Sequence, residues 1–158
     1  MQQQWRDQSD AWLRETIRKH GWAVQSVLGN HRKRYPDFSY TVGLWGFGHP
    51  ELLVIGLAAD VAGWLLNQLG QLVRAGESLR AGQSVYCPNL RGGSDLQLRR
   101  VPNPHEILFV AQNVYSGPGL RKVPALQVCY PDSYGRYPWE PGYADTRWLQ
   151  PPPGRFAA

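Results

Sequence analysis

The sequence lacks the features that would place a protein in a membrane or in a metal-stabilised fold. No apolar run approaches the ~20 residues of a transmembrane helix, and the first residues lack the basic-then-apolar layout of a signal peptide. The two cysteines, Cys87 and Cys129, form no CxxC pair, and no histidine stands at zinc-finger spacing. We therefore expect a soluble cytoplasmic protein with two buried, reduced thiols.

Familiar catalytic motifs are also missing. The chain has no GxGxxG after a strand, no GxxxxGK[ST] and no GxSxG, which disfavours the dinucleotide-binding, P-loop and α/β-hydrolase classes. A metal at His49 and Glu51 would need a third ligand such as His20 or His31, and no HExxH-like spacing supplies one. We expect neither a metal nor a cofactor.

The composition that is present suits a globular domain. The 158 residues are 42% hydrophobic and 12% aromatic, with only 18% charged. A chain of this length buries roughly 68–70% of its unfolded surface, so wholesale disorder is excluded. No linker or internal repeat divides the sequence, which indicates a single domain over residues 1–158.

The charge is basic and is carried mainly by arginine. Seventeen basic residues, of which fourteen are Arg, stand against twelve acidic ones, giving a net charge of +5. Arginine grips carboxylates and phosphates in a bidentate manner, so an anionic small molecule or a protein is the expected partner. The only dense basic cluster, residues 31–34, is more typical of a solvated loop than of a phosphate site, so nucleic acid and membrane are disfavoured. The sequence does not give the oligomeric state.

Hydrophobic periodicity predicts an α+β fold, with a mainly antiparallel sheet of five or six strands and two or three helices packed against it. The helix over residues 5–20 carries a stripe with Trp12, Leu13 and Ile17, and a second helix over 60–75 begins with Asp60 as a cap and ends at Gly76. We expect these two helices to cover one apolar face of the sheet. The expected strands span residues 22–28, 38–44, 52–57, 84–87, 96–101 and 123–130, and a further helix spans 104–115.

The burial of individual strands also follows from their patterns. Alternation over 38–44 predicts a half-buried strand, and the all-apolar run over 52–57 predicts a central one. Short connections favour antiparallel pairing. Residues 131–158 contain six prolines and several aromatics without periodicity, and we expect this segment to pack on the core.

Four phrases occur in order along the chain: His20-Gly21-Trp22, Tyr40-Thr41-Val42-Gly43-Leu44, Gly48-His49-Pro50-Glu51, and the run 130–139 that begins Tyr130-Pro131-Asp132 and ends Gly135-Arg136-Tyr137-Pro138-Trp139. In these phrases the sequence resembles the bacterial domain-of-unknown-function 4262 family, over roughly residues 17–151. The resemblance implies a small, stand-alone, mostly bacterial cytoplasmic protein and implies no activity. The end departs from the family pattern, because Pro152-Pro153 stands where an aliphatic residue is commoner.

The first candidate site is the loop 45–51. It places Trp45, His49 and Glu51 among glycines, which allow close approach of backbone to a ligand. His49 could act as a general base oriented by Glu51. In the alternative interpretation, His49 bonds backbone carbonyls in a hairpin and Glu51 pairs with an arginine.

The second candidate site lies just after the last strand. Asp132, Arg136 and Trp139 could wall a pocket for a flat or anionic molecule, with Tyr40 as a further ligand-binding candidate. The alternative is an aromatic clasp over the core with an internal Asp132–Arg136 ion pair. Tyr40 is more typical of a core tyrosine with a bonded hydroxyl.

Two functions of different class follow. The absence of a catalytic signature favours a binding or regulatory module in a stress, competition or defence setting. The alternative is a small enzyme that acts on an anionic or nucleotide-like metabolite, with His49, Glu51 and Arg136 around one pocket at a shared end of the sheet.

Overall fold

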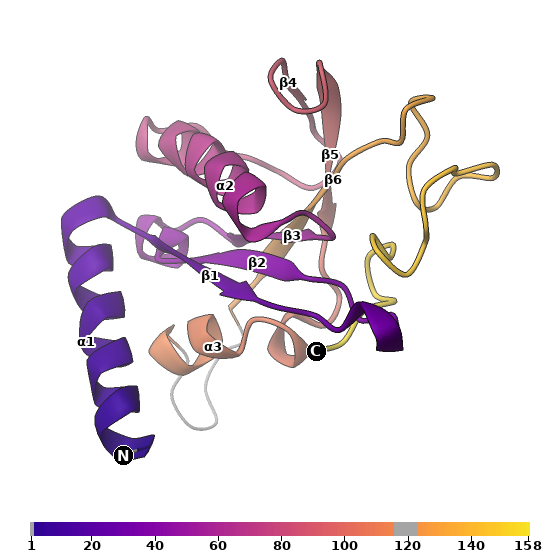
Figure 1. Ribbon diagram of the computed structural model, residues 1–158. Helices are drawn as coiled ribbons and strands as arrows, with labels where there is room; N and C mark the ends of the chain where they lie inside the picture. Colours follow the sequence, from indigo (N-terminus) through magenta and orange to yellow (C-terminus); the bar gives the residue numbers. More distant parts are fainter. Residues whose placement is uncertain (1, 116–122) are drawn as a thin grey trace.

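The computed structural model describes residues 2–115 and 123–158, which form three α-helices and one six-stranded sheet (Figure 1). The helices are α1 (Gln2–His20), α2 (Ala59–Arg74) and α3 (Phe109–Tyr115). The strands are β1 (Ala23–Val27), β2 (Phe38–Val42), β3 (Glu51–Ile55), β4 (Ser84–Cys87), β5 (Ser94–Arg100) and β6 (Ala125–Cys129). Short 3₁₀ turns span η1 (His31–Lys33), η2 (Leu44–Phe47) and η3 (Pro104–Glu106). The predicted α+β class is confirmed.

The strand order is β1-β2-β3-β6-β5-β4, with one parallel pair in an otherwise antiparallel sheet. Strands β3 and β6 run parallel, with Glu51 opposite Ala125 and Leu53 opposite Gln127. The prediction of a mainly antiparallel sheet is confirmed, and β3 and β6 are parallel because a long crossover through α2, β4, β5 and α3 separates them. Their two carboxyl ends therefore meet at the same edge of the sheet.

Both faces of the sheet are covered, which differs from the prediction of one apolar face. Helix α2 packs on one face, and α3 lies on the other together with Phe156 from the C-terminal segment (Figure 1). Strand β3 is central and fully buried, as predicted. Strand β2 is buried on both faces rather than half-buried, since Ser39 and Thr41 are covered as completely as Phe38.

Helix α1 covers little of the sheet, contrary to the prediction that it shares a face with α2. It lies beside the edge strand β1 (Figure 1), and in its predicted stripe Leu13 is buried and Ile17 is half-buried. The neighbouring Trp12 is 56% exposed. The helical periodicity was therefore correct for the element, but much of the stripe lines the surface.

The two ends of α2 differ in how their backbone groups are satisfied. Ala58 precedes the first turn without a side-chain cap, and Asp60 lies inside that turn, so the predicted Asp60 cap is wrong. At the other end, Gly76 has a φ of 99°, and its N–H and that of Glu77 donate to Val73 and Leu72. This Schellman arrangement confirms the predicted role of Gly76.

The predicted helix over 104–115 is divided into the 3₁₀ turn η3 and the short helix α3. Residues 131–158 have no helix or strand, yet Tyr137, Tyr143 and Phe156 are buried. Gln127 donates to the carbonyl of Pro151, which ties this segment to the central strand β6. Among the described residues, no helix has the length and apolar character needed to cross a bilayer.

Candidate functional site

His49 lies just before β3 and is 94% buried, with both ring nitrogens bonded to the backbone. The N–H of Leu79 can only donate, so Nε2 of His49 accepts it at 3.0 Å. The proton is then on Nδ1, which donates to the carbonyl of Pro50 at 2.8 Å. The imidazole therefore joins Leu79, which follows α2 in the chain, to Pro50 at the start of β3. The lone pair on Nε2 is occupied by the hydrogen bond from Leu79.

Glu51 is fully buried and organises the loop that precedes it. Its carboxylate accepts hydrogen bonds from the hydroxyl of Thr41 and from the N–H groups of Gly43, Leu44 and Trp45 at 2.9–3.4 Å. Burial raises its pKa from 4.5 to about 7, against the opposing effect of these four donors. The partners are backbone groups and a hydroxyl, rather than the arginine that the sequence suggested.

Tyr40 and Trp45 belong to the surroundings of the same carboxylate. Tyr40 is 99% buried, and its hydroxyl accepts from the N–H of Val110 at 3.1 Å. Burial raises the pKa of Tyr40 to about 12, with the nearby Glu51 as a smaller contribution in the same direction. Trp45 is half-buried and holds Glu51 through its backbone.

Asp132 is buried and holds the turn that follows β6. Its carboxylate accepts from the N–H groups of Tyr134, Arg136 and Ala144 at 2.7–2.9 Å. Burial alone would raise the pKa of Asp132, but these three hydrogen bonds and the positive charge of Arg136 together outweigh it and lower the pKa. The guanidinium of Arg136 donates to the carbonyl of Gly142, so the suggested Asp132–Arg136 ion pair is replaced by backbone hydrogen bonds.

Trp139 takes part in a stack that fixes the C-terminal segment on β5. Its ring lies 5.1 Å from that of Tyr137 at an angle of 6°, and the guanidinium of Arg99 lies 4.2 Å from its centre. The hydroxyl of Tyr137 donates to the carbonyl of Asp95 at 2.6 Å. These contacts match the arrangement expected of an aromatic clasp.

The predicted site residues form two groups at opposite ends of the sheet. His49 and Glu51 lie at the amino end of β3, whereas Asp132 and Arg136 follow the carboxyl end of β6. Because β3 and β6 are parallel, these two ends point in opposite directions. The sequence suggested a shared pocket with His49, Glu51 and Arg136, because each group sets a potential anion donor among glycines and aromatics. This pocket is not formed.

A cleft of about 720 Å³ opens at the carboxyl end of β3. One wall is the β3–α2 connection with the first turns of α2, and the other is the turn between β4 and β5. Its apolar lining is supplied by Leu57, Val61, Trp64 and Leu90, and its polar groups are those of Asp60, Asn89 and Arg91. The volume and this mixture of apolar walls with few polar groups are typical of small-molecule sites.

Gly56 shows how closely the chain segments approach beneath this cleft. Its φ is 92°, and a Cβ there would lie 2.6 Å from the hydroxyl of Tyr130. That hydroxyl donates to the carbonyl of Ile55 at 2.9 Å, which joins the ends of the two parallel strands. Burial, above all, raises the pKa of Tyr130, so the hydroxyl stays protonated as this bond requires. The floor of the cleft is therefore rigid.

Arg91 stands at the centre of this region and was not identified by sequence reasoning. Its φ is 51° and that of Gly92 is 78°, and Gly93 N–H donates to the carbonyl of Leu90, as in a type I′ turn. Asn or Gly suits the first central position of such a turn better than arginine does. The one feature of the sequence that could have pointed to Arg91 is its position directly before Gly92 and Gly93.

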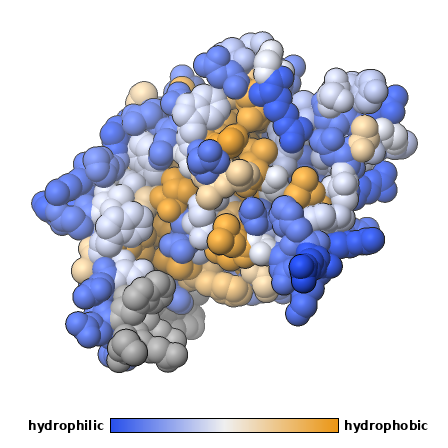
Figure 2. Space-filling view, viewed as in Figure 1, coloured by the Kyte–Doolittle hydropathy of each residue, from blue (hydrophilic) through white to orange (hydrophobic). Residues whose placement is uncertain are grey.

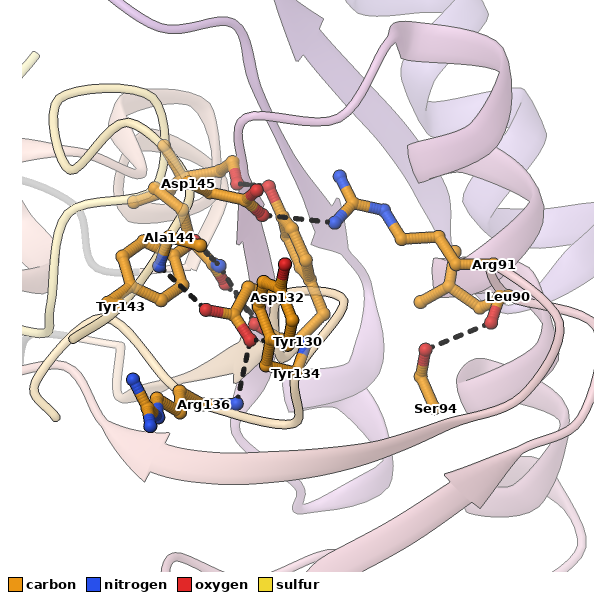
Figure 3. A network of polar contacts seen from close by, with 12 residues as sticks. Leu90, Arg91, Ser94, Tyr130, Asp132, Tyr134, Arg136, Tyr143, Ala144 and Asp145 are labelled. Carbon is orange, nitrogen blue, oxygen red and sulfur yellow. Dashed lines mark hydrogen bonds and ion pairs between the residues drawn. The ribbon is translucent and has the colours of Figure 1, made fainter.

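The side chain of Arg91 extends from this turn toward the C-terminal segment (Figure 3). Its guanidinium lies 4.9 Å from the centre of the Tyr130 ring, and Nη1 is 3.2 Å from the carboxylate of Asp145. On this second side it lines another cleft of about 470 Å³, together with Ser94, Asp95 and Asp132 among others. Arg91 is thus the cation shared by two adjoining clefts.

The two cysteines form no disulfide bond. Cys87 and Cys129 are both buried and unpaired, as predicted. Burial raises the pKa of Cys129 to about 12, so its thiol is protonated near neutral pH. Within the described part of the chain, no group of three or more His, Cys, Asp or Glu side chains could hold a metal ion.

The fold and these clefts define a small single-domain α+β protein with ligand-sized hollows at the carboxyl ends of its two parallel strands. The family model described as "Domain of unknown function (DUF4262)" matches residues 16–144. The chain therefore belongs to this family. Searches of curated proteins and of solved structures return no match.

Proposed function

We propose that this protein is a binding module for a small amphipathic anion, which it takes into the cleft beside Arg91. The apolar part of the ligand packs on Leu57, Val61 and Trp64, and the anionic group is held by the guanidinium. Trp64 and Val61 are each 37% exposed, so they offer apolar surface without unfolding any element. This assignment develops the expectation of an anionic partner.

The observation that carries the proposal is the placement of Arg91. Its backbone adopts a left-handed conformation that arginine disfavours, and the Tyr130 ring supports its guanidinium. The guanidinium has five N–H donors, and the Asp145 ion pair uses one of them, at Nη1. Donors therefore remain for a carboxylate or phosphate from the cleft.

A matched set of ligands tests this function. We suggest a thermal-shift series with phenylacetate, 3-phenylpropionate and 4-phenylbutyrate, each compared with its uncharged amide. The acids should stabilise the wild-type protein and the amides should not. A charge-assisted hydrogen bond contributes roughly 1.5–3 kcal/mol, so Arg91→Asn should weaken binding of the acids about ten- to hundred-fold.

Asn is the preferred replacement because it suits the left-handed position of residue 91. Arg80→Asn serves as a control for loss of one positive charge, since Arg80 is exposed and lines neither cleft. Equal stabilisation by acids and amides, or undiminished binding to the Arg91→Asn variant, would contradict the proposal.

A further inference from the structure

A separate cleft of about 470 Å³ lies between α1, β1 and α2, and no residue of the two candidate sites predicted from the sequence lines it. Helix α1 contributes Trp12, Thr16 and His20, which recur at intervals of four residues on one stripe. Helix α2 contributes Asn67, Gln71 and Arg74, and the floor is formed by Trp22, Ala23 and Val24. Among the described residues, the charged or titratable groups that line this cleft are the basic His20 and Arg74, and no carboxylate does so.

Arg74 is held in place on the floor of this cleft. Its guanidinium lies 4.5 Å from the centre of the Trp22 ring. That ring is fixed in turn, because its Nε1 donates to Asn67 at 2.9 Å and a Cβ at Gly70 would come within 2.6 Å of it. A stacked guanidinium keeps its N–H edge available for an anion, so Arg74 is preorganised for one.

Trp12 supplies a flat apolar surface at the same cleft. It is 56% exposed, while its neighbour Leu13 is 5% exposed and anchors the helix. The indole therefore makes little contribution to the core, although it is the largest side chain on this part of α1. Aromatic rings in solvent-exposed clefts stack favourably on other flat rings.

We propose that this cleft is a second ligand site, which binds a phosphorylated aromatic compound of the nucleoside monophosphate class. The aromatic ring stacks on Trp12, and the phosphate is bound by Arg74 with His20 beside it. Thr16, Asn67 and Gln71 add hydroxyl and amide groups to the rim, which suit a sugar or base edge. The site shares no lining residue with the Arg91 cleft.

Basic side chains in the last turns of α1 and α2 also interact favourably with the helix dipoles. That role requires only the positive charge. It requires neither the stacking of the guanidinium on Trp22 nor an exposed indole at position 12. Arg74→Lys keeps the charge at the end of α2 and removes the planar donor edge, so it separates the two roles.

The test follows the indole Nε1–H signals by NMR during titration with adenosine 5′-monophosphate, adenosine or inorganic phosphate. We expect the monophosphate to bind at least tenfold more tightly than either fragment. Trp12→Ala should weaken binding of the monophosphate and of adenosine, and Arg74→Lys should weaken binding of the monophosphate and of phosphate, each about tenfold. Trp12 is exposed, so its variant should remain folded.

One control defines the site. Arg18→Lys changes an exposed arginine near the same end of α1 that is paired with Glu15. This variant should bind the monophosphate like the wild type. A monophosphate that binds no more tightly than phosphate alone, or unchanged affinity in both the Trp12 and Arg74 variants, would overturn this inference.

Discussion

In the described part of the chain, two arginines, Arg34 and Arg91, adopt the left-handed backbone conformation, with φ values of 56° and 51°. Such a conformation costs an ordinary residue roughly 1–2 kcal/mol, and Asn tolerates it better. Arg34 is exposed and closes the turn η1. Arg91 instead has the Tyr130 ring and Asp145 as partners, which offset the backbone cost.

A pair of variants measures that difference. Arg34→Asn should stabilise the protein by about 0.5–1 kcal/mol, because it relieves the unfavourable backbone conformation at this position. Among the described residues it removes no ion pair or cation–π contact such as those of Arg91. Arg91→Asn should give a smaller gain or none, since the Tyr130 and Asp145 contacts are lost with the side chain. Urea unfolding of both variants gives the two values, and an equal gain would mean that the Arg91 contacts contribute nothing.

Glu51 makes the stability of the protein depend on pH in a defined direction. Its pKa is about 7 in the folded protein and 4.5 as a free side chain, so between these values the folded state holds a proton that the unfolded state has lost. The contribution of Glu51 to stability is then fully present below pH 4.5 and is lost as the pH rises through 7. The shift corresponds to a loss of about 3 kcal/mol.

The prediction for Glu51 is checked by urea unfolding of the wild type and Glu51→Gln at pH 5 and pH 8. The wild type should be less stable at pH 8, whereas the variant should show much less of this difference. The variant should also be less stable overall, because its amide cannot accept all four hydrogen bonds. A wild type that gains stability between these pH values would refute the assignment.

At the scale of single elements, α2 contains two glycines with opposite surroundings. A Cβ at Gly70 would meet the Trp22 ring at 2.6 Å, whereas a Cβ at Gly63 would meet nothing within 4 Å. Gly63→Ala should therefore stabilise the helix by about 0.5–1 kcal/mol through propensity alone. Gly70→Ala should instead destabilise the protein by about 1–3 kcal/mol, because it forces the indole out of place.

Thermal or urea unfolding of the two alanine variants distinguishes these effects. If both substitutions stabilise the protein, Trp22 does not pack closely on α2. The description of Trp22 as the floor of the cleft beside Arg74 would then also be wrong.

Local sequence patterns predicted the positions of the helices and strands well, but they predicted less well which faces of these elements are buried. The all-apolar run in β3 and the Gly76 cap are set by neighbouring residues, so sequence alone was sufficient for both. The burial of Ser39 and Thr41 depends on distant segments that cover the second face of β2. Trp12 has the periodicity of a core residue and yet lies at the surface, because α1 packs mainly along the edge strand β1.

At the scale of the whole molecule, the parallel pairing of β3 and β6 decides where the site lies. It brings the β3–α2 connection, the β4–β5 turn and the C-terminal segment to one edge, and it moves His49 and Glu51 to the other. No local pattern encodes that pairing. For this reason the sequence could not predict that Arg91 lines the same cleft as Trp64 or that it pairs with Asp145.

The C-terminal segment also acts at this scale, because it is bonded to the central strand β6. Gln150 accepts from the N–H of Tyr130 and donates to its carbonyl, and Phe156 packs on Phe38 across the second face. A chain that ends at Pro131 should therefore unfold at a much lower urea concentration or become insoluble. A chain that lacks only Ala157 and Ala158, which are exposed, is the control and should change little.

A shortened chain that kept the full unfolding midpoint would contradict the packing of this segment on the core. The truncation also removes Asp145, so its effect on ligand binding is measured separately with Asp145→Asn in the full chain.

The most direct test of the central claim is an NMR titration of the wild-type protein with 4-phenylbutyrate, which follows the Arg91 Nε–H and Trp64 indole N–H signals. Both signals should shift together and saturate, and the uncharged amide should not cause this. The indole signals of Trp12 and Trp22, in the other cleft, should stay in place. Shifts confined to other residues, or equal shifts with the amide, would contradict the assignment of the Arg91 cleft as an anion-binding site.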